Sequence, residues 1–94
     1  MTIVSAEQRD LLAKVELGLD AEKFLRSNVG QFLQSRALAE VEDCLIELKT
    51  ADAENPKVIR EIQQRIAVAE CMFVWLNEAI TMASSAEHTL NNME

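Results

Sequence analysis

The strongest fold signal in the chain lies in residues 55–83, which read NPKVIREIQQRIAVAECMFVWLNEAITMA. Asn55 is a good helix cap, and Pro56 suits the first helical position because the amide proton that it lacks would be unpaired there. Apolar residues then recur at steps of three and four through eight positions: Ile59, Ile62, Ile66, Ala69, Phe73, Leu76, Ile80 and Ala83. This period predicts one long amphipathic helix over residues 56–83. The polar residues 84–94 have no clear period and are expected to fray.

A second amphipathic helix is predicted just upstream, over residues 29–50. Its apolar positions again step by three and four, with a flanking set that widens the stripe: Leu38, Val41, Leu45 and Leu48, flanked by Leu33, Ala37 and Cys44. Five residues, 51–55, join the two helices. So short a link favours a long antiparallel helical hairpin whose apolar stripes face each other.

The N-terminal part of the chain predicts shorter elements. Ser5 followed by Gln8 is a capping-box pattern and starts a helix over residues 6–17, which Gly18 is expected to end. Residues 21–27 support one more short helix. The predicted fold is therefore all-α: a single domain over residues 1–94, in which a long hairpin carries one or two short helices packed on it.

The last long helix has more apolar surface than one neighbour can cover. Besides its hairpin stripe, a second line recurs every seven residues, with a third line beside it: Val68, Trp75 and Met82, accompanied by Met72 and Ala79. A single neighbouring helix covers a stripe of about 100°. We expect these five residues to form a subunit interface in a helical-bundle homo-oligomer. The alternative is that the short N-terminal helices cover them within one monomer.

Composition narrows the possible functions. Nine Lys and Arg stand against 16 Asp and Glu, for a formal net charge of −7, and no Lys or Arg follows Arg65. Phosphate backbones would be repelled, so nucleic-acid binding is not expected. The longest apolar run is Cys71–Leu76, only six residues, so neither a membrane span nor an export signal is predicted. We expect a cytoplasmic protein with two free thiols, because the hairpin register places Cys44 opposite Ile62 and far from Cys71.

No catalytic constellation is evident, and the chain is predicted not to be an enzyme. His88 is the only histidine and lies in the polar tail. Glu40, Asp43 and Glu47 share a helix face, where carboxylates are more often solvated than metal-bound, with Arg36 as a surface partner of Glu40. No metal or other cofactor is predicted.

Four residues around a predicted bend form a candidate anion site: Lys23, Arg26, Asn28 and Arg36. The amides at the start of a helix near residues 27–30 could bind a small phosphate-bearing ligand. The competing interpretation is structural: Ser27 and Asn28 cap a helix, Gly30 permits a bend, and the cations offset Asp20 and Glu22.

The whole chain, with its NPKVIREIQ helix start and the segment RDLLAKVELGLDAEKFL, resembles small acidic helical proteins of tailed bacteriophages and prophages. The resemblance implies a role executed by binding inside a bacterial host, as an assembly accessory or as an inhibitor of a host defence. Two other functions are kept open: an oligomeric sponge that sequesters nucleotides at subunit junctions, and an acidic mimic that blocks a nucleic-acid groove on a host protein. The expected partners are a second copy of the chain and a host or phage protein.

Overall fold

The computed structural model describes residues 5–93, and within this range the chain is all-α with no strand. Three helices follow one another: α1 over Ala6–Arg26, α2 over Asn28–Thr50 and α3 over Pro56–Asn92. The all-α prediction is confirmed. The molecule is long and thin, with extents of 67 × 29 × 16 Å.

α1 starts where the capping box predicts. The Gln8 amide N–H donates to Ser5 Oγ at 3.1 Å, and the Ser5 amide N–H donates to Gln8 Oε1 at 3.0 Å. The expected end at Gly18 does not occur, because Gly18 is buried against Ala79 and Ala83 of α3. Here glycine lets two helices approach closely instead of ending one. The predicted helices 6–17 and 21–27 are thus a single helix of 21 residues.

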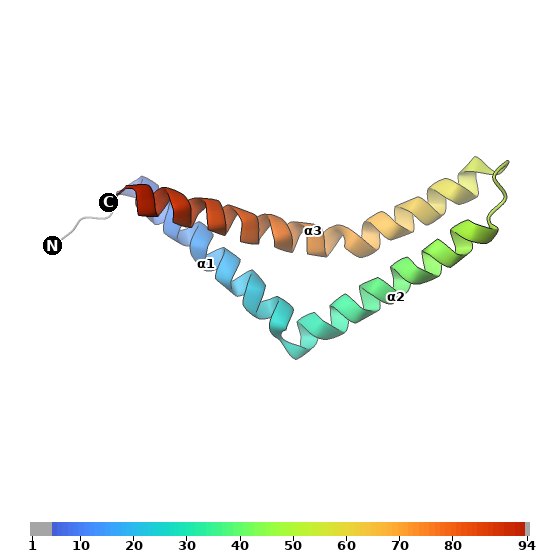
Figure 1. Ribbon diagram of the computed structural model, residues 1–94, viewed down its shortest axis with the longest axis horizontal. Coiled ribbons are helices and arrows are strands. Elements are labelled where there is room, and N and C mark those ends of the chain that lie inside the picture. The colour runs from blue at the N-terminus through green and yellow to red at the C-terminus, as the bar shows by residue number, and fades with distance from the viewer. Residues whose placement is uncertain (1–4, 94) are drawn as a thin grey trace.

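The chain turns sharply between α1 and α2. Ser27 alone separates the helices and caps both, since its amide N–H donates to the Lys23 and Phe24 carbonyls while its Oγ accepts from the Gly30 amide. Any side chain at position 30 would overlap the Phe24 carbonyl oxygen, so the tight turn requires glycine there. Figure 1 shows the result, a corner from which α1 and α2 diverge.

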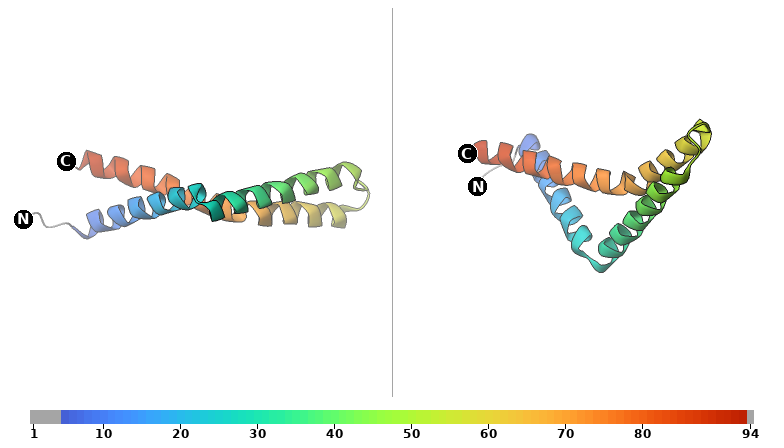
Figure 2. Two further views of the ribbon diagram at one scale, coloured as in Figure 1. Left: turned by 90° about the horizontal axis from the view of Figure 1, so that it is seen from below. Right: turned by 45° about the vertical axis from the view of Figure 1, so that its right-hand side comes forward.

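α3 is the element that holds the other two. After the link at residues 51–55 it runs back past α2 and then past α1, so that its C-terminal end lies beside the start of α1 (Figures 1 and 2). Residues 84–92, expected to fray, are helical, and Ala86 among them is buried while Leu90 is partly buried. Packing on α1 therefore extends the helix to 37 residues, about 55 Å at 1.5 Å per residue.

The enclosed core is small. In the part of the chain that the structure describes, the buried apolar side chains are Ala21, Cys44, Ile62 and Ala86. The predicted inner stripe of α2 is partly wrong, because Leu38 and Leu45 are exposed whereas Cys44 of the flanking set is buried. On α1, Leu12 and Leu17 are likewise exposed, and the partly buried Leu11 and Val15 lie closer to α3. The three helices form a thin layer with little interior.

Candidate interaction surface

The three apolar residues of the seven-residue repeat are all exposed on α3. Val68 is 72% exposed, Trp75 64% and Met82 44%. Val74, which the repeat does not include, is also exposed, but it lines a recess between α2 and α3 with Leu38 and Phe73. We call the three residues of the repeat, Val68, Trp75 and Met82, the outer α3 face. The other two residues predicted for the interface, Met72 and Ala79, are partly buried.

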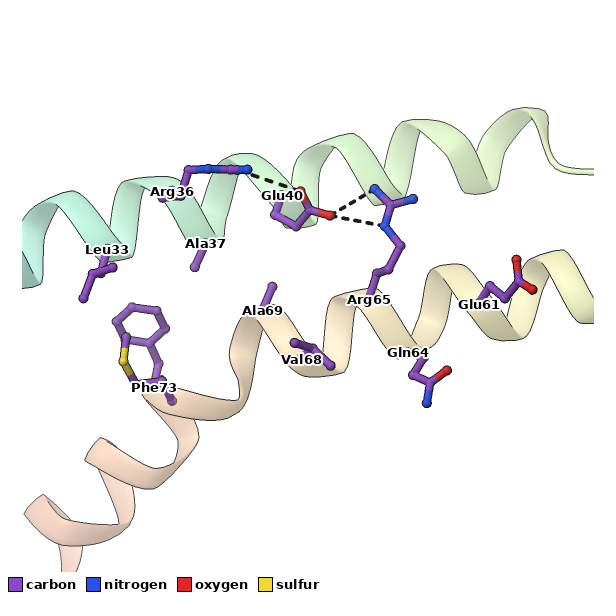
Figure 3. Close-up of a pocket in the computed structure, with 11 residues that line it drawn as sticks. Leu33, Arg36, Ala37, Glu40, Glu61, Gln64, Arg65, Val68, Ala69 and Phe73 are labelled. Atoms are coloured by element: carbon purple, nitrogen blue, oxygen red, sulfur yellow. Dashed lines mark hydrogen bonds and ion pairs between the residues drawn. The ribbon is translucent and has the colours of Figure 1, made fainter.

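Trp75, at the centre of the outer α3 face, points away from α2. Figure 3 shows Phe73 pointing from α3 toward α2. Trp75 follows two residues later, which on an α-helix is a rotation of about 200°. The indole therefore lies on the opposite side of α3 from Phe73, where neither α1 nor α2 covers it. The sequence-based alternative, in which the N-terminal helices cover Trp75 within one monomer, is not what the structure shows.

A cavity of about 790 Å³ adjoins this face between α2 and α3. Its apolar lining comes from both helices, and includes Leu33, Ala37, Ala69, Met72 and Phe73 (Figure 3). Val68 also lines it, so the cavity opens directly beside the outer α3 face. Ala37 and Ala69 are too small to fill the space where α2 begins to diverge from α3. The protomer thus presents both an exposed apolar line and an unfilled apolar recess.

A charged cluster joins α2 to α3 next to the recess. Arg65 of α3 donates from Nη2 and Nε to Glu40 Oε1 at 3.0 and 3.2 Å, and from Nη1 to Glu47 Oε2. These hydrogen bonds, first to Glu40 and then to Glu47, raise the pKa of the Arg65 guanidinium above its usual value. Glu40 also pairs with Arg36 at 3.8 Å, as the sequence predicted. The bridging role of Arg65 was not predicted, because its partners lie on another helix.

The two cysteines are both free thiols in different surroundings. Cys44 lies between Glu40 and Glu47 on α2 and is completely enclosed. Burial raises the pKa of its thiol, and the nearby Arg65 opposes that shift only in part. Cys71 is partly exposed and lies one turn from both Val68 and Trp75. Cys44 is therefore a core residue, whereas Cys71 borders the outer α3 face.

The structure separates the residues of the candidate anion site. Lys23, Arg26 and Asn28 are exposed at the corner, but Arg36 lies two turns into α2, where it lines the cavity and pairs with Glu40. The Gly30 amide, which could have bound an anion, donates to Ser27 Oγ at 3.0 Å. Within residues 5–93 no group of three or more His, Cys, Asp or Glu side chains is arranged to hold a metal ion. His88 is exposed, with its Nε2 3.2 Å from Asn92 Nδ2.

No protein-family model matches the chain, and neither the curated proteins nor the solved structures contain a significant match. By length and composition alone, α3 is apolar enough to cross a membrane. The sequence prediction missed this property because it considered only unbroken apolar runs, and Glu70 and Glu78 interrupt them. None of this apolar window is buried within the protomer, so packing against α1 and α2 does not account for its composition.

Proposed function

We propose that the protein is a self-associating helical interaction protein, which acts by binding a partner and carries out no reaction. The assembling unit is the antiparallel hairpin of α2 and α3 with α1 packed on the second half of α3. The observation that carries the proposal is the outer α3 face, a line of large apolar side chains exposed to between 44 and 72%. Exposed apolar surface of this kind marks protein interaction sites.

Energetic considerations favour association over a solitary protomer. Full burial of a large apolar side chain stabilises a protein by about 1.5–3 kcal/mol. In the described part of the chain, nothing larger than Ile62 is buried, while Trp75 and Val68 remain largely in water. Covering the outer α3 face with a second copy would recover stabilisation that the thin protomer lacks. Trp and Met are also enriched at protein interfaces, and both occur on this face.

The biological role that fits this assembly is occupation of a partner protein. The resemblance to small phage and prophage proteins suggests two such roles in a bacterial cytoplasm, assembly accessory and inhibitor of a host defence. The acidic surface suits a basic partner protein and disfavours nucleic acid. Affinity capture from bacterial lysate, with a variant that cannot self-associate as the control, would identify the partner.

Mass measurement in solution tests the self-association. The protein is expected to be larger than a monomer at micromolar concentration, and Trp75→Glu is expected to dissociate it by placing a charge on the outer α3 face. Gln63→Glu is the matched control, since Gln63 is exposed on the same helix and lies outside that face. A wild-type protein that is monomeric at high micromolar concentration would contradict the proposal.

Sequestration of a nucleotide is a second candidate function, favoured by the exposed cations Lys23 and Arg26 at the corner. These side chains would bind phosphate groups at a junction between copies. Thermal unfolding with mono- and cyclic nucleotides distinguishes this function. A melting temperature that rises with a nucleotide in the wild type, but not in Lys23→Ala or Arg26→Ala, would support it, and indifference to all nucleotides would reject it.

A further inference from the structure

Two segments of this acidic chain carry opposite net charge, and within the first segment Arg36 is already paired with Glu40. Residues 23–39 contain Lys23, Arg26 and Arg36 and no Asp or Glu. Residues 66–93 contain Glu70, Glu78 and Glu87 and no Lys or Arg. The first segment forms the α1–α2 corner, and the second forms most of α3 beyond Arg65. Each segment is therefore complementary in charge to the other.

Both segments also present apolar side chains to solvent. At the corner, Val29 is 61% exposed and Phe32 66%. On α3, Glu78 lies one turn from both Trp75 and Met82. The outer α3 face is thus apolar with an acidic residue beside it, whereas the corner is apolar with basic residues beside it. Two surfaces that each combine apolar and charged side chains, with charges of opposite sign, favour a specific contact with each other.

The two surfaces lie on opposite edges of the protomer and differ in shape. The corner projects away from α3, and α3 bends where it passes the corner, with its concave side turned outward (Figures 1 and 2). Trp75 lies on the opposite side of α3 from Phe73, which points toward α2 (Figure 3). Because the corner points away from its own α3, the corner cannot cover the outer α3 face of the same chain.

We propose that the α1–α2 corner of one protomer docks on the outer α3 face of a second copy. In this contact Phe32 and Val29 pack against Val68 and Trp75, and Lys23 and Arg26 approach Glu78. The inference rests on the self-association proposed above and adds its geometry. The contact is heterologous, since it joins two different patches. Each bound copy leaves its own outer α3 face free for the next, so the contacts close into a ring or continue as a filament.

Charge reversal on each side tests the pairing. The corner variant is Lys23→Glu/Arg26→Glu, and the face variant is Glu78→Lys. All three side chains are exposed, so both variants are expected to keep the helical circular dichroism of the wild type. Each variant alone should associate at least tenfold more weakly than the wild type, because it brings like charges together. An equimolar mixture should associate as tightly as the wild type, since every contact between unlike variants pairs opposite charges.

The possible outcomes separate this inference from the proposed function. If the wild type is monomeric, both fail. If the wild type is oligomeric and the corner variant keeps the same mass and affinity, the corner is not in the interface and only the docking geometry is overturned. The geometry is also overturned if the variants weaken association but their mixture does not restore it. Restoration in the mixture, together with at least tenfold weaker association of Phe32→Ala, supports the geometry.

Discussion

Gly18 shows how a single residue sets the distance between α1 and α3. A Cβ at this position would overlap the Ala83 Cβ and would lie 3.2 Å from the Ala79 carbonyl oxygen. Intrinsic propensity favours alanine over glycine in a helix interior by about 1 kcal/mol, so an unobstructed site would be stabilised by the change. A loss of stability on Gly18→Ala would therefore come from the close contact with α3, because helix propensity alone would give a gain.

We expect Gly18→Ala to lower the free energy of unfolding by about 1–3 kcal/mol, as overpacking does. Urea denaturation measures the change. The matched test is Gly18→Ala/Ala83→Gly, which moves the missing methyl group to the other helix. The double variant should lose less free energy of unfolding than the sum of the losses in the two single variants. Strict additivity, or a stabilised Gly18→Ala, would disagree with the described contact.

The two thiols should differ in reactivity and in their response to pH. Cys71 is expected to be alkylated quickly in the native protein and Cys44 only after unfolding, because Cys44 is fully enclosed. Burial raises the pKa of Cys44 above its ordinary value, so the fold favours the protonated thiol. The resulting stabilisation is present at neutral pH and is lost as the pH rises above about 9.

Mass spectrometry of alkylated native protein and urea denaturation at pH 7 and pH 10 check these two expectations. Cys44→Ala is the control for the pH dependence, since it removes the buried thiol. A stability loss at pH 10 that is equally large in Cys44→Ala would assign the effect to other groups.

At the level of the helices, the last turns of α3 are part of the fold. Ala86 is 3% exposed, whereas the adjacent Ser85 is exposed. Ala86→Glu is expected to lower the free energy of unfolding by at least about 2 kcal/mol, because it places an unpaired charge between helices. Ser85→Glu adds the same charge one residue away and should change stability by about 0.5 kcal/mol or less. Equal stability of the two variants in urea denaturation would mean that residues 84–92 do not pack on α1.

How far each helix could be predicted depended on whether its signal was local. The Ser5 capping box and Pro56 set the starts of α1 and α3 by interactions within a few residues, and both starts were predicted. The continuation of α1 through Gly18 and of α3 beyond Ala83 depends on contacts between residues more than 60 positions apart. No local pattern encodes those contacts, so sequence reasoning ended both helices early.

The same distinction applies to the candidate surface. The seven-residue recurrence of Val68, Trp75 and Met82 is local, and the structure finds all three exposed. The exposure of Phe32 and Leu38 depends on the direction in which α2 leaves the corner, which Ser27 and Gly30 set. The Arg65 bridge to Glu40 and Glu47 depends on the alignment of α2 with α3.

For the whole molecule, the thin shape makes stability and assembly inseparable. If copies cover one another's outer α3 faces, the folded form is favoured at higher protein concentration by mass action. The melting temperature is expected to rise when the protein concentration is raised from about 1 to about 100 µM. This range spans typical micromolar dissociation constants. Trp75→Glu should melt at a lower temperature that no longer depends on concentration. A wild-type melting temperature that is constant over this range would show that the protomer is stable alone.

The position of α3 as the helix that holds the other two also affects biosynthesis. α1 and α2 diverge from their corner, so neither can bury its apolar side against the other (Figure 1). During translation both must wait, as unsupported helices of marginal stability, until α3 has emerged from the ribosome. The part of α3 that pairs with α1 emerges after α1, α2 and the first half of α3. Folding of the three helices is therefore expected to wait for this part of α3, and a ribosome stalled before residue 83 should hold a nascent chain that proteases readily cut.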